Sequence, residues 1–138
     1  MKSFTALSSL TLALAVIFGA FGAHALKGIL DPYSIEIYNK ASFYHFIHGL
    51  GSLVVSLMPP LNLLTPRRAK QVCSLHLFGI LLFSGSLYLL SISGQHWLGA
   101  ITPMGGACFI LGWLVLGVAA NMPSCHVSTE SCVNNGPL

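Results

Sequence analysis

Seven polar side chains within otherwise apolar stretches are the candidates for chemistry in this sequence. Imidazole, hydroxyl and phenol groups can hydrogen-bond between helices, or they can line a small polar site. The first use is structural and the second is functional. Both interpretations concern one candidate polar cluster, which consists of His24, Tyr44, His48, Ser84, Ser86, Tyr88 and Thr102.

These residue types exclude several kinds of catalysis. No Asp or Glu lies inside an apolar stretch, so Ser84 and Ser86 lack the carboxylate that orients a histidine base in a serine hydrolase. Proton-coupled or cation-coupled transport usually relies on such a carboxylate as well. The sequence therefore predicts no catalytic residue and no enzymatic activity.

Histidines are numerous enough to hold a haem or a metal ion, and haem sites do occur between facing helices of bundles. However, we expect His76 to lie near the inner end of its helix, far from His24, His45 and His48. His45 and His48 also point about 60° apart on one helix. Near the C-terminus, Cys125, His126 and Cys132 lack the paired spacing of a zinc site. We therefore expect neither a metal nor a cofactor.

The distribution of charge identifies the elements that position these side chains. Only 7% of the residues are charged and 54% are hydrophobic, against about 25% charged in an average soluble domain. A membrane-spanning helix needs about 20 apolar residues, and three charge-free stretches provide room for four such helices. The predicted spans lie near residues 4–26, 41–64, 71–93 and 102–122. Residues 123–138 form a polar tail that we expect to be disordered.

The predicted fold is thus all-α, an integral membrane four-helix bundle with antiparallel, up-and-down topology. Three of its helices start with a capping residue followed by proline, at Asp31-Pro32, Thr65-Pro66 and Thr102-Pro103. Ala23-His24-Ala25 resembles a signal-peptide cleavage site. The apolar run before it is longer than a usual signal peptide, which favours retention of the first helix.

Lysine and arginine residues predict the orientation. Lys2, Arg67, Arg68 and Lys70 lie on one side of the membrane, and Lys27 and Lys40 lie on the other. The excess of positive charge favours both termini in the cytoplasm. The net charge of +3 is divided among loops, and no basic cluster is interleaved with exposed aromatic residues, so we expect no nucleic-acid partner.

Small residues at helical spacing predict how the helices pack. In lipid, helices associate where small side chains let their backbones approach closely. The residues expected to serve this packing are Gly19, Gly22, Gly85, Gly105, Gly106 and Gly112. With antiparallel neighbours, the candidate polar cluster then gathers in one half of the bundle, at the end where the first helix finishes.

Four segments of the chain resemble the four motifs of a known family. Phe18 to Leu26 (FGAFGAHAL) resembles its first-helix motif, and Tyr44 with His48 its second. Phe83 to Tyr88 (FSGSLY) is similar to the third motif, and Thr102 to Gly106 (TPMGG), followed by Phe109, Gly112 and Trp113, to the fourth.

This is the YgdD/YwdK-like family of small membrane proteins, known as domain of unknown function 423 and related to eukaryotic transmembrane protein 256. The resemblance covers about residues 4 to 120 and implies a four-helix protein of the bacterial inner membrane. It implies no activity. His45, His76 and the C-terminal cysteines lie outside the family pattern.

The sequence therefore predicts a multi-pass protein of the inner (plasma) membrane, embedded in the lipid bilayer. We expect a non-enzymatic structural component that packs with itself or with a larger membrane complex. The alternative is a membrane-embedded binding protein for a lipid headgroup, a haem or a quinone at the candidate polar cluster.

Overall fold

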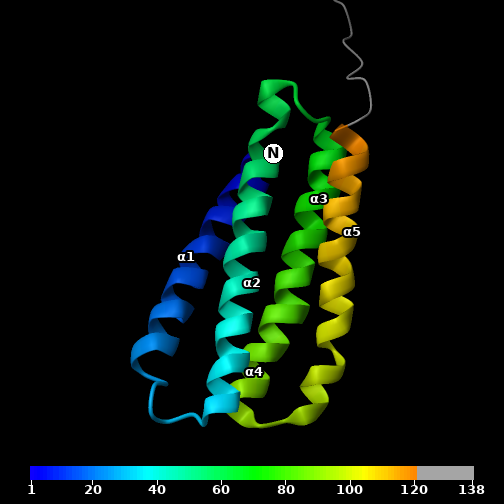
Figure 1. The fold of residues 1–138 in the computed structure, drawn as a ribbon. Helices are drawn as coiled ribbons and strands as arrows, with labels where there is room; N and C mark the ends of the chain where they lie inside the picture. Colours follow the sequence, from blue (N-terminus) through cyan, green and yellow to red (C-terminus); the bar gives the residue numbers. More distant parts are fainter. Residues whose placement is uncertain (121–138) are drawn as a thin grey trace, which may run out of the picture.

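The computed structural model describes residues 1–120, which fold as the predicted all-α bundle (Figure 1). Four helical segments are long and apolar enough to cross a membrane, as predicted from the charge-free stretches: Lys2–His24, Pro32–Leu61, Pro66–Ser93 and His96–Ala120. The fold class is thereby confirmed. The predicted polar tail, with Cys125, His126 and Cys132, lies outside the described residues.

Within these four segments the helical geometry changes several times. The α-helices are α1 (Lys2–His24), α2 (Pro32–Leu57), α3 (Pro66–Gly79), α4 (Gly85–Ser93) and α5 (Thr102–Ala120). Short 3-10 turns, η1 (Pro59–Leu61) and η3 (His96–Ala100), follow α2 and precede α5. A π-helical turn, η2 (Ile80–Ser84), joins α3 to α4 in the middle of one span.

Two of the three predicted helix starts have the expected cap. Asp31 accepts hydrogen bonds from the backbone N–H groups of Tyr33 and Ser34, at 2.9 and 3.1 Å. The hydroxyl of Ser34 also donates to Asp31, and this hydrogen bond is the main cause of the lowered pKa of the Asp31 carboxyl. Thr65 caps α3 through the N–H of Arg68. Thr102, in contrast, is the first residue of α5.

Side-chain contacts fix the directions of neighbouring helices. Ser8 on α1 is hydrogen-bonded to Ser52 on α2 at 2.9 Å, and the Tyr38 hydroxyl donates to the Phe18 carbonyl at 2.8 Å. Residue numbers therefore fall along α2 as they rise along α1, so these two helices run in opposite directions. The Cys73 thiol, which donates to the Ser52 carbonyl at 3.4 Å, joins α3 to the other side of α2.

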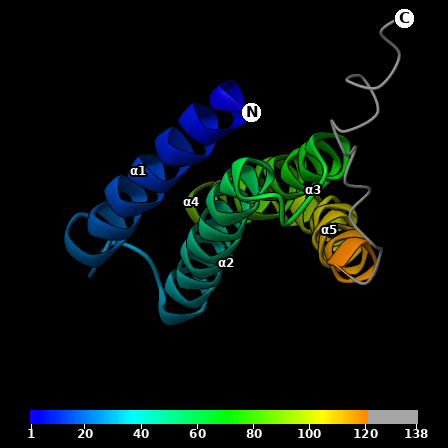
Figure 2. The same cartoon turned by 90° about the horizontal axis from the view of Figure 1, so that it is seen from above.

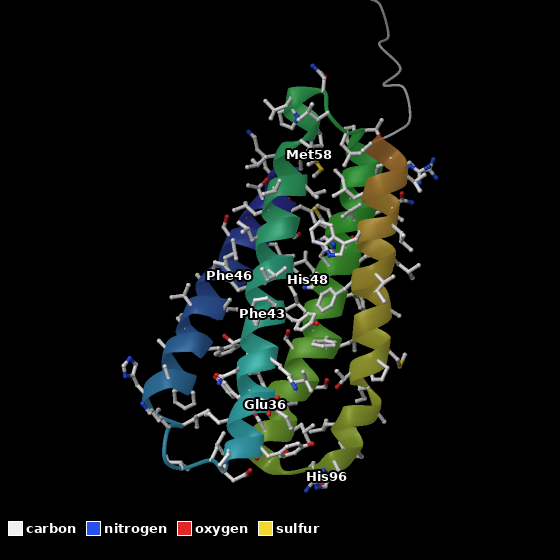
Figure 3. All side chains as sticks on the ribbon, in the orientation of Figure 1. Glu36, Phe43, Phe46, His48, Met58 and His96 are labelled. Carbon is white, nitrogen blue, oxygen red and sulfur yellow. The ribbon has the colours of Figure 1, made fainter. Side chains whose placement is uncertain are left out.

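Apolar clusters close the two ends of the bundle, and the polar side chains lie between them. One cluster, around Val55, Val72 and Cys73, lies near the N-terminus. Another, around Leu26, Tyr38 and Ala41, lies near the loop between α1 and α2. Many large apolar side chains, Phe43 and Phe46 among them, point outward, while His48 is buried (Figure 3). An apolar exterior around a partly polar interior suits a bilayer.

The helix α1 has one main neighbour. It packs along α2 and stands apart from α3 and α5 when the bundle is seen along its axis (Figure 2). The helices α3 and α5 pack closely against each other on the opposite side of α2. This uneven packing leaves space between α1 and the span that contains η2.

Candidate binding site

The π-helical turn η2 places an unpartnered hydroxyl group in the interior of the bundle. At the end of this turn the Gly85 N–H donates to the Ile80 carbonyl, five residues back. Such widened turns insert one residue into an α-helix and are frequent at functional sites. Ser84, the last residue of the turn, has no exposed surface, and its Oγ has no hydrogen-bond partner among residues 1–120.

Ser84 differs in this respect from the three serines of α4. The hydroxyl groups of Ser86, Ser91 and Ser93 each donate to a backbone carbonyl three or four residues back, at 3.0, 2.8 and 2.6 Å. This local bond is the usual way in which a serine satisfies its hydroxyl within a helix. A buried hydroxyl that lacks it costs roughly 1–3 kcal/mol, so Ser84 is the exception that calls for a physical explanation.

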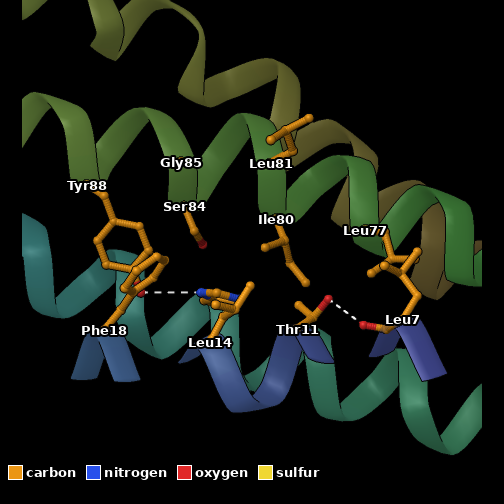
Figure 4. Close-up of a pocket in the computed structure, with 11 residues that line it drawn as sticks. Leu7, Thr11, Leu14, Phe18, Leu77, Ile80, Leu81, Ser84, Gly85 and Tyr88 are labelled. Carbon is orange, nitrogen blue, oxygen red and sulfur yellow. Dashed lines mark hydrogen bonds between the residues drawn. The ribbon is translucent and has the colours of Figure 1, made fainter. Parts of the chain in front are cut away.

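The hydroxyl of Ser84 faces a cavity of about 340 Å³ between α1 and the span formed by α3, η2 and α4 (Figure 4). A volume of this size is at the lower end of the range of small-molecule sites. Apart from Ser84 and three further polar side chains, the lining is apolar. The lining residues are Leu7, Thr11, Leu14, Phe18, His45, Leu77, Ile80, Leu81, Ser84, Gly85 and Tyr88.

One end of the cavity is closed by a group of aromatic rings. The Tyr88 hydroxyl lies 3.4 Å from Nδ1 of His45, and both side chains are buried. The Phe18 ring packs edge-on against Tyr88, with ring centroids 5.2 Å apart. Tyr38 packs behind Tyr88 at 4.8 Å. The ring of His45 also lies close to the backbone of Thr11.

A second group of rings lies between α2, α3 and α5. The His48 Nδ1–H donates to the Tyr44 carbonyl at 2.9 Å, and the His48 ring stacks on Phe109 with centroids 3.4 Å apart. His76 lies 5.5 Å from His48 and 4.7 Å from Trp113, centroid to centroid. The expectation that His76 lies far from His48 was therefore wrong. Ten residues separate His76 from the start of α3, a rise of about 15 Å, which places it near mid-span.

Both nitrogens of His76 are buried and have no hydrogen-bond partner within the described residues. Nevertheless, residues 1–120 contain no group of three or more His, Cys, Asp or Glu side chains that could hold a metal ion.

The structure divides the candidate polar cluster into separate groups. Ser84 and Tyr88 line the cavity, whereas Tyr44 and His48 belong to the second group of rings, at whose edge Tyr44 packs on Phe83. The hydroxyl groups of Ser86 and Thr102 are hydrogen-bonded to each other at 2.8 Å, which ties α4 to α5. His24 is exposed at the end of α1, away from the cavity, and makes no hydrogen bond within the described residues.

The glycines expected to serve packing also differ from one another. At three of these glycines an added Cβ atom would overlap a neighbour. The overlap is with the Tyr38 ring at Gly22, with the backbone of Phe83 at Gly105, and with the His76 ring at Gly112. At Gly19 it would lie 3.3 Å from the hydroxyl of Ser42, a tight contact. At Gly85 and Gly106 the nearest atoms would be 4.0 and 3.7 Å away, so these two glycines are not required by close packing.

Several lining residues were not among the candidates from the sequence. Leu7, Leu14 and Leu77 are indistinguishable in sequence from leucines that face lipid. Thr11 and His45 are polar residues of apolar stretches, and that signal could have identified them. The widened turn at Ile80–Ser84 has no signature in the sequence that we recognise.

Four candidate membrane spans, with a largely apolar cavity between α1 and its neighbours, define a small multi-pass membrane protein. The chain belongs to the family described as "Protein of unknown function (DUF423)", whose model matches residues 18–106. It is 46% identical over 119 residues to a UPF0382 membrane protein of Staphylococcus epidermidis, covering 86% of this chain and 95% of that protein. It is 40% identical over 121 residues to the UPF0382 membrane protein YwdK of Bacillus subtilis, and the match covers 87% of this chain and 97% of that protein. No solved structure matches the chain.

Proposed function

We propose that this protein is a non-enzymatic, membrane-embedded binding protein for a small amphiphilic molecule, which occupies the cavity between α1 and the span containing η2. The unpartnered hydroxyl of Ser84 carries the proposal. It is fully buried, it faces the cavity, and it does not make the backbone bond that the serines of α4 make. A bound molecule with one polar atom would remove the cost of burying this group.

The sequence alone favoured a structural or complex-associated component over a binding protein. The cavity shifts that preference, because a purely structural role gives no reason for a buried serine hydroxyl without a partner beside an open volume. The absence of enzymatic activity remains part of the proposal. Within the described residues, the carboxylates Asp31 and Glu36 lie on the exposed start of α2, away from His45 and Ser84.

We also propose that the protein resides in the plasma membrane with both termini in the cytoplasm. The similar proteins are bacterial and are named membrane proteins. Arg67, Arg68 and Lys70 begin α3 at the end of the bundle where α1 starts, and an excess of positive charge marks the cytoplasmic side (Figure 1).

The proposed function is tested by filling the cavity and analysing what the protein retains. Leu14 and Leu10 both lie on α1, but only Leu14 lines the cavity. The side chain of Leu10 is 57% exposed on the outside of the bundle. The variants Leu14→Trp and Leu10→Trp therefore make a matched pair. Each would be purified in a mild detergent beside the parent protein, extracted with organic solvent, and analysed by mass spectrometry.

We expect a molecule enriched over bulk lipid in the parent protein and in Leu10→Trp, and lost in Leu14→Trp. The measurement is the molar ratio of that molecule to protein. If no molecule is enriched in the parent protein, or if Leu14→Trp retains it in full, the binding proposal is wrong. A purely structural component would then be the better interpretation.

A further inference from the structure

From the lining of the cavity we infer the chemical class of its ligand: an uncharged, single-chain lipid whose head carries one neutral oxygen, a hydroxyl or a carbonyl. This inference rests on the proposed function and adds a specificity to it. Three features of the cavity support it: the arrangement of its polar groups, the depth at which they lie, and its length.

Three of the four polar side chains that line the cavity lie toward one end; Thr11, the fourth, lies nearer the other end, where its hydroxyl donates to the Leu7 carbonyl at 2.8 Å (Figure 4). Ser84 and Tyr88 lie on consecutive turns of the same span, and Tyr88 contacts His45 on α2. Leu7 and Leu77 face each other at the other end (Figure 4). The Tyr88 hydroxyl is paired with Nδ1 of His45, whereas the Ser84 hydroxyl has no partner within residues 1–120. A hydroxyl both donates and accepts, so it can bind a carbonyl or another hydroxyl.

The depth of Ser84 argues against a charged head. Nine residues separate it from Ser93, the last residue of α4, which corresponds to about 14 Å along the helix. No Lys, Arg, Asp or Glu lines the cavity. A phosphate or carboxylate at this depth would be buried without a countercharge, and burying an unpaired charge is far more costly than burying a neutral oxygen.

The length of the cavity sets the size of the chain. Its lining residues on α1 run from Leu7 to Phe18, eleven residues or about 17 Å along the helix. An extended backbone advances about 1.2 Å for each covalent bond, so a chain of roughly 14 bonds would reach from one end to the other. With its oxygen at Ser84, seven residues or about 10 Å from Leu77, such a chain would place about nine bonds in the cavity and extend the rest beyond its open side.

Three probes of equal chain length separate the contributions of chain, neutral oxygen and charge: tetradecane, 1-tetradecanol and tetradecanoate. Each is added at pH 8, where the carboxylate is ionised, to protein stripped of lipid by detergent exchange. Affinity is obtained from the rise in the thermal unfolding midpoint with ligand concentration, at constant detergent. Ser84→Ala is the variant, and Ser91→Ala is its control, because Ser91 is a buried serine of α4 that does not line the cavity.

We expect 1-tetradecanol to bind about fivefold more tightly than tetradecane, the value of one net neutral hydrogen bond. Ser84→Ala should abolish this preference while still binding tetradecane, and Ser91→Ala should retain it. Tetradecanoate should bind more weakly than the alcohol. Equal or tighter binding of tetradecanoate would overturn the inferred class and leave the binding function in place. If no probe binds, the inference fails, and the extraction experiment on Leu14→Trp decides separately whether the binding function fails with it.

Discussion

A pair of adjacent glycines at the start of α5 provides a sharp test of the close contact with the π-helical turn. A Cβ atom at Gly105 would overlap the backbone nitrogen of Phe83 and would lie 2.8 Å from its Cα. Both are main-chain atoms of η2, so no side chain can rotate away to relieve the overlap. At Gly106 the added methyl group would meet only the Phe83 ring, at 3.7 Å, an ordinary van der Waals distance.

Both Gly105→Ala and Gly106→Ala reduce the conformational entropy of the unfolded chain, which by itself stabilises the folded protein by roughly 0.4–1 kcal/mol. Only Gly105→Ala adds overpacking, which typically costs about 1–3 kcal/mol. We therefore expect Gly105→Ala to be less stable than Gly106→Ala by roughly 1–3 kcal/mol, with Gly106→Ala at or slightly above the parent protein.

The assay is reversible unfolding of purified protein in mixed detergent micelles by titration with sodium dodecyl sulfate, followed by circular dichroism. Both variants and the parent protein are measured at the same micelle concentration. If Gly105→Ala and Gly106→Ala agree within about 0.5 kcal/mol, the size expected of a neutral surface substitution, the close approach of α5 to η2 is refuted.

The same titration distinguishes two fully buried serines. Ser52→Ala should lower the free energy of unfolding by about 1 kcal/mol, because it removes the hydrogen bond to Ser8. Ser84→Ala, measured in lipid-stripped protein, should leave the free energy of unfolding unchanged or raise it, because this hydroxyl has no partner to lose. An equal loss in both variants would mean that Ser84 has a partner within the protein. His24→Ala should leave the unfolding midpoint unchanged, because this side chain is exposed and unpaired within the described residues; a clear drop would place it in a contact. A periplasm-active or exterior-active reporter fused after Leu138 should stay silent, and activity would reverse the proposed orientation. The contribution of Asp31 to stability should be constant well above its ordinary pKa of 3.8 and should be lost as the pH falls below it, since acid protonates a carboxylate whose pKa is lowered in the folded state. The measurement is the difference in stability between the parent protein and Asp31→Asn across a pH titration, which should shrink at low pH; a difference that grows on acidification would contradict the cap.

The number and positions of the membrane-spanning helices could be predicted because they depend on local features of the sequence. Charge-free stretches mark the spans, Asp31-Pro32 and Thr65-Pro66 mark helix starts, and Gly94 ends α4 in the left-handed conformation, with φ 69°. Each is a local signal with a local physical cause.

The candidate site was only partly predictable, because it depends on rotations of helices that are not local. The π-helical turn changes which residues of its span face inward, and it turns Ser84 toward the cavity. The sequence predicts His76 near the end of its helix, whereas the side chain lies near mid-span beside His48. The cavity itself arises because α1 packs mainly on α2 rather than on the span containing η2, and the sequence pattern does not predict this arrangement.

The attachment of α1 to a single neighbour has a consequence for biogenesis. During synthesis α1 enters the membrane first, before α2, the helix on which it packs, has been made. The opposite wall of the cavity, from Leu77 to Tyr88, is synthesised later still. The helices α2 to α5 share contacts with one another that do not involve α1. We therefore expect these helices to associate as a core onto which α1 docks last, so that the order of insertion is not the order of assembly. A newly made protein would then enclose its cavity only in the final step, with the surrounding lipid still free to enter it.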